Sequence, residues 1–419
     1  MEKSDNKSLE TQSIADDAAA AASNEARRKV LVLFGTRPEA IKLAPVIHEL
    51  RAKNFRTVVV SSSQHKDLLK PFLKLLAVET DYDLKVMSRN QTPNEVCSRV
   101  LSKLDKILET EKPDLILVQG DTTTTLAGAL AGFNRQIKVG HIEAGLRSGN
   151  LQSPFPEEMN RRLTSQMASF HFAATEKNKR NLAAEGVSTE KIFVTGNTVV
   201  DSLQFILKNL APGEKIRETI EQTKGLKRIL LTTHRRESFG AAMSGNLQVL
   251  ADFVEKRKNV CLIFPVHPNP NVRAATEKIL ARRERIFLLE PLDYMDFVAL
   301  MKKSWLIVSD SGGVQEEAPS LGKPLFVLRE NTERPEAVEA KIAKLVGGNP
   351  QTLQKMLEEN YAVETWIKSV REIRNPFGDG RAAKKIVEIV AKQLRAEPHK
   401  TRKLGTAATA TKIRPEFQI

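Results

Sequence analysis

From residue 29 onward, short apolar runs alternate with helix-length amphipathic stretches. The first run, 30–34, is apolar throughout, is followed by Gly35, and leads into a helical pattern from Ala40 with Pro38 near its start. Glycine at a strand exit and proline in a first helical turn are typical of a strand-loop-helix unit. The unit recurs, and further strands are predicted at 56–61, 114–118, 137–142, 170–174 and 192–194.

A second series of apolar runs follows a polar stretch, 209–225, that contains Pro212 and two glycines. It predicts strands at 228–232, 260–264, 286–289, 305–309 and 324–328. Strands that are apolar throughout and alternate with helices indicate a parallel sheet covered on both faces. The sequence therefore predicts an α/β fold with two doubly wound, Rossmann-like parallel-sheet domains that face a central cleft.

Shifts in composition divide the chain further. Residues 1–28 are polar and Ala-rich, and we expect them to be a disordered extension. An N-terminal α/β domain is predicted at 29–203 and a C-terminal α/β domain at 204–375. A last helix, within 376–395, is expected to pack back on the first domain, and 396–419 to form a flexible basic tail.

The composition is that of a soluble globular protein, with 41% apolar and 28% charged residues among 419. No apolar run approaches the roughly 20 residues that span a bilayer, and the N-terminus lacks the pattern of a secretory signal. Cys97 and Cys261 lie far apart, which argues against a disulfide framework. These features predict a cytoplasmic protein with no membrane partner.

The net charge of +14 raises the question of nucleic-acid binding. Part of this charge lies in the predicted tail, and much of the rest is scattered singly over helices. Aromatic residues make up only 5% of the chain and are not interleaved with a basic stripe, so a nucleic-acid partner is not favoured. A basic balance also suits a small substrate that carries a diphosphate.

The strongest candidate for ligand binding is the segment 309–317, which follows a strand and opens a helix. Gly312 and Gly313 allow close approach of a ligand, and the helix start can accept a diphosphate, although short glycine motifs also occur in ordinary turns. Glu317 could accept hydrogen bonds from ribose hydroxyls. The first strand is not followed by Gly-x-Gly-x-x-Gly, which argues against a dinucleotide cofactor.

Three carboxylates follow predicted strand ends or begin a helix: Asp121, Glu143 and Glu157. An Asp at such a position is often a helix cap, and acidic residues in a first helical turn often only complement the helix dipole. Their convergence on one cleft is nevertheless what acid–base chemistry requires, because neighbouring groups there can hold different protonation states.

From the opposite domain, His234 heads a loop beside Arg235 and Arg236, an environment that favours anions. The seven histidines show no metal-ligand spacing, so no metal is predicted. No Gly-x-Ser-x-Gly segment supports a nucleophilic serine.

Taken together, these segments resemble the non-hydrolysing UDP-N-acetylglucosamine 2-epimerases, a family with the two-domain fold of many nucleotide-sugar glycosyltransferases. The similarity extends from about Lys29 to about Ala391. Nine segments carry it in order: FGTRPEAIKLAP (34–45), GDTTTTLA (120–127), HIEAGLR (141–147), SPFPEEMNR (153–161), TGNTVVD (195–201), HRRESFG (234–240), PVHPNPNVR (265–273), DSGGVQEEAPSLGKP (310–324) and TERPEA (332–337).

The resemblance implies roles for particular residues. The family's catalytic groups fall on Asp121, Glu143, Glu157 and His234. Its substrate contacts fall on Arg37, Lys42, Phe297, Ser311, Gly312, Gly313, Glu317 and Arg334. Leu292 stands where some members carry Gln, and Thr233 replaces a glycine found before the histidine in some members.

The implied reaction is the C2 epimerisation of UDP-N-acetylglucosamine to UDP-N-acetylmannosamine, by elimination and re-addition of UDP without a cofactor. It would supply N-acetylmannosamine for cell-surface polysaccharide. The resemblance also implies a homodimer and, from Gln64, His65 and Arg235, activation by the substrate at a second site. Three alternatives stay open: a hydrolysing epimerase, an epimerase of a UDP-diacetamido-uronic acid, and a glycosyltransferase on the same fold.

Overall fold

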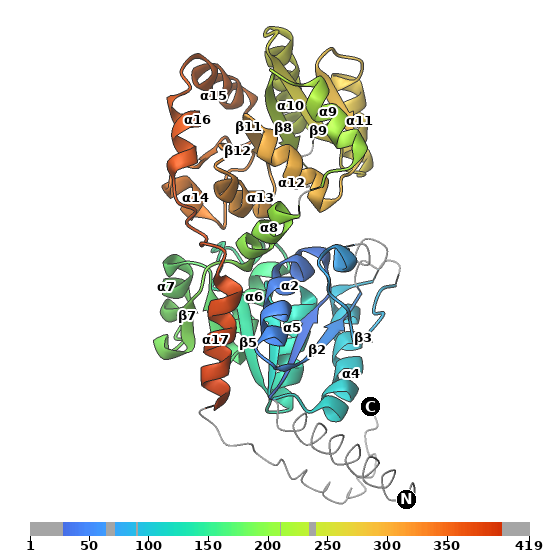
Figure 1. The fold of residues 1–419 in the computed structure, drawn as a ribbon, viewed down its shortest axis with the longest axis vertical. Coiled ribbons are helices and arrows are strands. Elements are labelled where there is room, and N and C mark those ends of the chain that lie inside the picture. The colour runs from blue at the N-terminus through green and yellow to red at the C-terminus, as the bar shows by residue number, and fades with distance from the viewer. Residues whose placement is uncertain (1–27, 64–71, 89–90, 210, 234–239, 396–419) are drawn as a thin grey trace, which may run out of the picture.

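The computed structural model describes residues 28–63, 72–88, 91–209, 211–233 and 240–395. Within these ranges the chain forms two parallel β-sheets, one in each half, with helices between successive strands (Figure 1). The predicted α/β class with two doubly wound sheets is therefore confirmed. The expectations for the N-terminal extension up to residue 27 and for the tail from 396 concern residues outside these ranges.

The first sheet has the order β3-β2-β1-β4-β5-β6-β7. Its strands are β1 (Lys29–Phe34), β2 (Arg56–Ser61), β3 (Tyr82–Asp83), β4 (Leu115–Gln119), β5 (Lys138–Ala144), β6 (Phe170–Ala173) and β7 (Ile192–Val194). The helical segments among and after them are α2 (Arg37–Ala52), α4 (Pro93–Glu111), α5 (Thr123–Asn134), α6 (Glu157–Met167), α7 (Glu176–Ala184), η1 (Thr189–Lys191) and α8 (Thr198–Lys208).

The second sheet has the order β10-β9-β8-β11-β12-β13. Its strands are β8 (Lys227–Thr232), β9 (Val260–Pro265), β10 (Ile286–Leu289), β11 (Leu306–Ser309), β12 (Leu325–Val327) and β13 (Ala343–Leu345). Its helical segments are α9 (Glu214–Gln222), α10 (Ala241–Glu255), α11 (Pro270–Leu280), α12 (Tyr294–Lys303), α13 (Gly312–Glu317), η3 (Ala318–Leu321), α14 (Pro335–Glu339), α15 (Pro350–Ala362), α16 (Thr365–Ser369) and η4 (Val370–Glu372).

Alternate residues of a central strand face different helical layers. In β1, Val30, Val32 and Phe34 join one core cluster, whereas Leu31 and Leu33 join another. Both sets are buried, because helices cover both faces of the sheet and a strand sends successive side chains to opposite faces. Burial on both faces of the sheet therefore explains why this strand is a continuous apolar run in the sequence.

Two edge strands, β3 and β13, were not predicted. They contain two and three residues, and each places a charged residue, Asp83 or Lys344, in the strand. Both lie at the edge of a sheet, where one side of the strand has no neighbouring strand and an apolar run is not needed.

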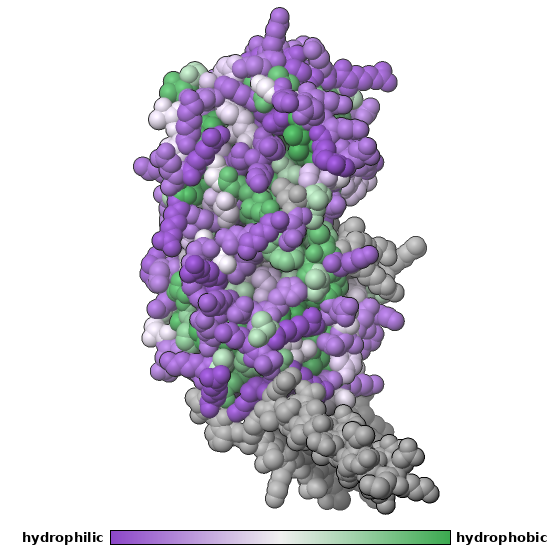
Figure 2. All heavy atoms as spheres, in the orientation of Figure 1, coloured by the Kyte–Doolittle hydropathy of each residue, from purple (hydrophilic) through white to green (hydrophobic). Residues whose placement is uncertain are grey.

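Helix α8 joins the two halves of the molecule. It packs against α2 in the first half and against α12 and α13 in the second. The last helix, α17 (Ala382–Arg395), returns across the junction and packs on α2 and α8 (Figure 1). One apolar cluster runs through this junction, and the face in Figure 2 shows hydrophobic groups about halfway along an otherwise largely hydrophilic surface.

Within the described ranges, no helix combines the length and the apolar character needed to cross a membrane.

Candidate active site

A cavity of about 660 Å³ lies between the two sheets, lined by loops that follow β1, β4, β5, β8, β9 and β11. Ligands of open parallel sheets bind at the carboxyl ends of the strands, so the cavity lies where the fold predicts a site. Every predicted site residue that the structure describes lines it: Arg37, Lys42, Asp121, Glu143, Glu157, Phe297, Ser311, Gly312, Gly313, Glu317 and Arg334. The other four, His234, Gln64, His65 and Arg235, lie outside the described residues.

Glu143 lies near the end of β5 in a left-handed backbone conformation, with φ of 65°. The pairing of β5 with β6 shifts register at this point, between Ile142 and Ala144. A non-glycine residue in this region costs roughly 1–3 kcal/mol and persists only where surrounding contacts hold it. The bulge aims the Glu143 side chain out of the sheet and into the cavity.

Two donors hold the buried carboxylate of Glu143. The ammonium group of Lys42, from α2, forms an ion pair with it, and Asn197 Nδ2 donates a hydrogen bond of 3.0 Å. Burial alone would raise the pKa of Glu143, but the positive charges of Lys42 and Arg334 outweigh burial and lower this pKa. Glu143 is therefore ionised at neutral pH.

A second buried carboxylate, Glu316 of α13, faces the same ammonium group. Its oxygen lies 3.6 Å from Lys42 Nζ, and it accepts a hydrogen bond of 2.7 Å from Arg334 Nε. Burial raises the pKa of Glu316, and Arg334 and Lys42 oppose that rise. Lys42 thus bridges carboxylates from the two halves of the molecule. No role for Glu316 was predicted, although it lies in the segment 310–324 that carries the family resemblance.

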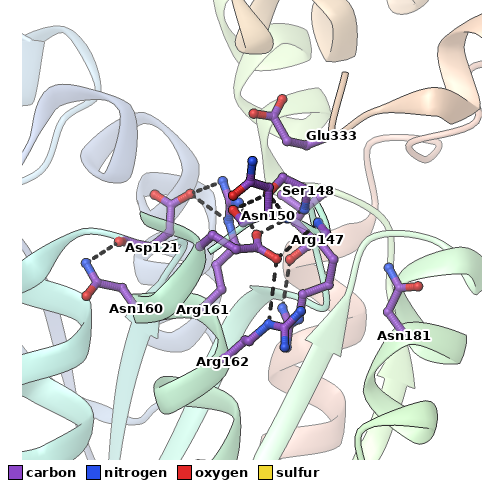
Figure 3. Close-up of polar contacts among 12 residues, drawn as sticks. Asp121, Arg147, Ser148, Asn150, Asn160, Arg161, Arg162, Asn181 and Glu333 are labelled. Atoms are coloured by element: carbon purple, nitrogen blue, oxygen red, sulfur yellow. Dashed lines mark hydrogen bonds and ion pairs between the residues drawn. The ribbon is translucent and has the colours of Figure 1, made fainter. Parts of the chain in front are cut away.

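Asp121 follows β4 and points toward α6 (Figure 3). Its carboxylate receives hydrogen bonds of 2.6 and 3.0 Å from Arg161 Nη2 and Nε, and the same arginine donates to Glu158 at 2.8 Å. The alternative that Asp121 caps α5 is wrong, because Thr122 is the N-cap and accepts the hydrogen bond from the Thr125 N–H. Glu157, half-buried, is the first residue of α6, so its side chain is also at the cavity wall.

The glycine pair at the start of α13 serves two different purposes. A Cβ atom at Gly312 would lie 2.7 Å from Arg334 Nη1, so a larger residue there would displace the arginine from its place against this turn. A Cβ atom at Gly313 would have no atom within 4 Å. Gly313 therefore borders open space in the cavity, where a ligand could approach the backbone closely.

A third buried carboxylate, Glu317, occupies the side of the cavity near α12. Tyr294 Oη donates to it at 2.6 Å, and burial raises the pKa of Glu317 to about 7 despite that hydrogen bond. Arg37, which also faces the cavity, has its guanidinium 5.0 Å above the ring of Phe72. Phe297 lies half-buried on α12 at the same wall. Tyr294 was not among the predicted site residues.

The fold and the cavity define a two-domain α/β protein whose site combines carboxylates from the first sheet with a glycine-rich helix start from the second. Comparison with known proteins identifies the family. Residues 48–391 match the UDP-N-acetylglucosamine 2-epimerase family, and the chain belongs to it. This match confirms the resemblance recognised in the sequence. Because an epimerase is an isomerase, the enzyme class is that of the isomerases.

Individual relatives support the same family assignment. The chain is 46% identical to a UDP-N-acetylglucosamine 2-epimerase of Neisseria meningitidis over 87% of this chain and 99% of the relative. It is 45% identical to that of Escherichia coli over 86% of this chain and 97% of the relative. A crystal structure of the Neisseria meningitidis enzyme bound to UDP-GlcNAc aligns with a TM-score of 0.81 at 45% identity, covering 87% of this chain and all of that chain.

Proposed function

We propose that the protein interconverts UDP-N-acetylglucosamine and UDP-N-acetylmannosamine by inverting C2 of the sugar. The observation that carries this proposal is the buried, ionised Glu143 in one cavity with Asp121 and Glu157. Inversion requires a proton to leave one face of the sugar and another to reach the opposite face, so at least two acid–base groups are needed. The similar enzyme of Neisseria meningitidis binds UDP-GlcNAc in its crystal structure, which supports this substrate.

The second sheet supplies the nucleotide side of the cavity. We assign the diphosphate to Ser311, Gly312 and Gly313, because a helix start presents free N–H groups and favours negative charge. Glu317 would accept hydrogen bonds from the ribose, and Phe297 would lie near the uracil. Arg37 and Arg334 would add positive charge toward the phosphates.

The proposed chemistry is elimination followed by re-addition. The C2 hydrogen is not adjacent to a carbonyl, so it becomes acidic only as the C1–O bond to UDP breaks and positive charge grows at C1. One carboxylate takes the C2 proton, the C1–O bond electrons leave with UDP, and a C1=C2 double bond forms, which gives 2-acetamidoglucal. UDP then adds back at C1 while a second carboxylate delivers a proton to the other face of C2. His234 would stabilise the departing diphosphate together with the helix start.

We further propose that the product supplies N-acetylmannosamine for cell-surface polysaccharide, and that the enzyme works as a cytoplasmic homodimer. Activation by the substrate at a second site would involve Gln64, His65 and Arg235. These points rest on the family resemblance, and sedimentation of the protein with and without UDP-N-acetylglucosamine tests the assembly.

The reaction is tested by proton NMR of the purified protein with UDP-N-acetylglucosamine in D₂O. We expect UDP-N-acetylmannosamine that carries deuterium at C2, without accumulation of free UDP. Stoichiometric UDP together with free N-acetylmannosamine would instead identify a hydrolysing epimerase. Absence of turnover would contradict the proposed substrate and redirect the assay to a UDP-diacetamido-uronic acid, and then to glycosyl acceptors.

The affinity for UDP is expected to rise with pH because Glu317 has a pKa of about 7. Ribose hydroxyls donate to the ionised carboxylate, so lowering the pH through this pKa removes an acceptor. Between pH 6 and pH 8 we expect the Kd for UDP to fall about tenfold, as a single linked proton allows. Calorimetric titration measures this change. In a Glu317→Gln variant, the remaining pH dependence of the Kd should come only from ionisation of the UDP phosphate. A pH dependence equal to that of wild type would contradict the assignment of Glu317 to the ribose.

A further inference from the structure

Asn197 lies at the start of α8 and uses each of its polar groups. The residue is 2% exposed. Oδ1 accepts a hydrogen bond of 3.0 Å from the Val199 N–H and so caps the helix. Nδ2 donates to Glu143 Oε2 at 3.0 Å. These two contacts fix the orientation of the amide, because only its oxygen can accept from the N–H and only its nitrogen can donate to the carboxylate.

The backbone of Asn197 contacts the segment by which the chain crosses back between the two sheets, 373–381. The Asn197 N–H donates to the Phe377 carbonyl at 2.7 Å. On the other side of the crossing, Asn375 accepts from the Phe377 N–H at 2.8 Å and donates to Ser320 Oγ at 2.6 Å. Asn197 therefore stands between the crossing segment, which is tied to the second half, and the carboxylate of Glu143.

We propose that Asn197 is a positioning residue for the reaction: its side chain holds the Glu143 carboxylate aimed into the cavity, and its backbone anchors the interdomain crossing. The inference rests on the proposed function of Glu143 and adds to it a residue that none of the predicted roles includes. A neutral amide is suited to this task, since it donates a hydrogen bond without neutralising the carboxylate, which must remain able to accept a proton.

The charged groups around Glu143 determine how its pKa responds when the hydrogen bond from Asn197 is lost. Among the described residues, the titratable and charged groups that interact with its carboxylate include Lys42 of α2, Glu316 of α13, Arg334 at the start of α14 and His141 of β5. Burial lowers the pKa of His141 to about 4, so its imidazole is neutral across the working range. Loss of the Asn197 donor is therefore expected to raise the pKa of Glu143, while Lys42 and Arg334 stay charged and His141 stays neutral.

Two substitutions separate positioning from folding. Asn197→Ser keeps a good helix cap but lacks a donor long enough to reach Glu143. We expect kcat to fall about tenfold or more with a smaller change in KM, and the acid limb of the kcat profile to move up by about one pH unit. Asn197→Asp keeps shape and cap, but can donate to Glu143 only when protonated. Its activity should therefore decline as the pH rises, where that of wild type does not.

Asn349→Ser is the matched control, because Asn349 caps α15 by accepting from the Gln351 N–H at 2.9 Å. It should retain the wild-type kcat and pH profile. A purely structural role for Asn197 would lower activity equally in both of its variants at every pH, in step with the midpoint of urea unfolding. That result, or a wild-type profile in Asn197→Ser, overturns the proposal.

A ligand-free measurement distinguishes failure of this inference from failure of the proposed function. Protein labelled with ¹³C at Glu carboxyl carbons is titrated by NMR, and the Glu143 signal is identified by its loss in Glu143→Gln. We expect its pKa to be higher in Asn197→Ser than in wild type, whether or not the enzyme turns over UDP-N-acetylglucosamine. An unchanged pKa contradicts the coupling even if the epimerase assay succeeds.

Discussion

The Glu143→Gln variant is expected to lose at least about 100-fold in kcat, with a smaller change in KM. Gln has nearly the same shape and can still accept hydrogen bonds, but it cannot take up a proton, which is the contribution that general acid–base catalysis makes. The carboxylate of wild-type Glu143 is kept ionised by Lys42 and Arg334, so the substitution removes the charge as well as the base. Initial rates of C2 inversion, followed by proton NMR, measure the effect.

Glu364→Gln provides the matched control. Glu364 also pairs with a lysine, since its carboxylate lies 2.6 Å from Lys227 Nζ, and its pKa is also lowered, mainly by that hydrogen bond. Lys227 begins β8, at the end of the strand away from the cavity, so this variant should keep the wild-type kcat. Near-full activity in Glu143→Gln would contradict the assignment of Glu143 to proton transfer, and an equal loss in both variants would point to a general effect on folding.

The layered fold was predictable because it follows from burial. The central strands of both sheets are covered by helices on two faces, so each contains a buried apolar run that can be recognised in the sequence. The short edge strand β13 could not be recognised in this way, because Ala343, Lys344 and Leu345 form no such run. Its pairing with β12 is determined by neighbours that lie far away in the sequence.

Sequence motifs identified residues that line the cavity, but they did not predict how these residues are arranged. Motifs placed Glu143 at a strand end, yet its left-handed backbone depends on the mismatch between β5 and β6 and on its partners Lys42 and Asn197. Successive helical residues point about 100° apart, so the sequence cannot tell which of Glu316 and Glu317 faces Lys42. Asp121 was open to interpretation as a cap for a similar reason, since the threonine that follows it competes for the same N–H groups.

Among these substitutions, removal of the Lys42 ammonium group should lower the free energy of unfolding the most. Lys42→Met keeps most of the apolar part of the side chain and removes its ammonium group. Two buried carboxylates, Glu143 and Glu316, are left without their shared partner; their side chains are 5% and 1% exposed. Breaking a buried pair in this way costs about 3–5 kcal/mol of unfolding free energy. Glu143→Gln should cost less, because there Lys42 retains Glu316. Urea unfolding at pH 8 measures the difference, and Lys177→Met, which breaks an exposed pair with Glu339 at 3.0 Å, should cost at most about 1 kcal/mol.

The deficit of Lys42→Met should also depend on pH in a defined direction. In wild type the pKa of Lys42 is raised above 10.5, so its contribution to stability is complete below 10.5 and is lost only as the pH rises through the raised value. The pKa of Glu143 is lowered below 4.5, so its contribution is complete above 4.5 and is lost as the pH falls through the lowered value. Without Lys42, burial raises the pKa of both carboxylates, and the penalty for their charge is relieved as they take up protons. The difference from wild type should therefore be largest near pH 8 and shrink toward pH 5. A deficit that stays constant over this range would show that Lys42 stabilises the protein by packing rather than by charge.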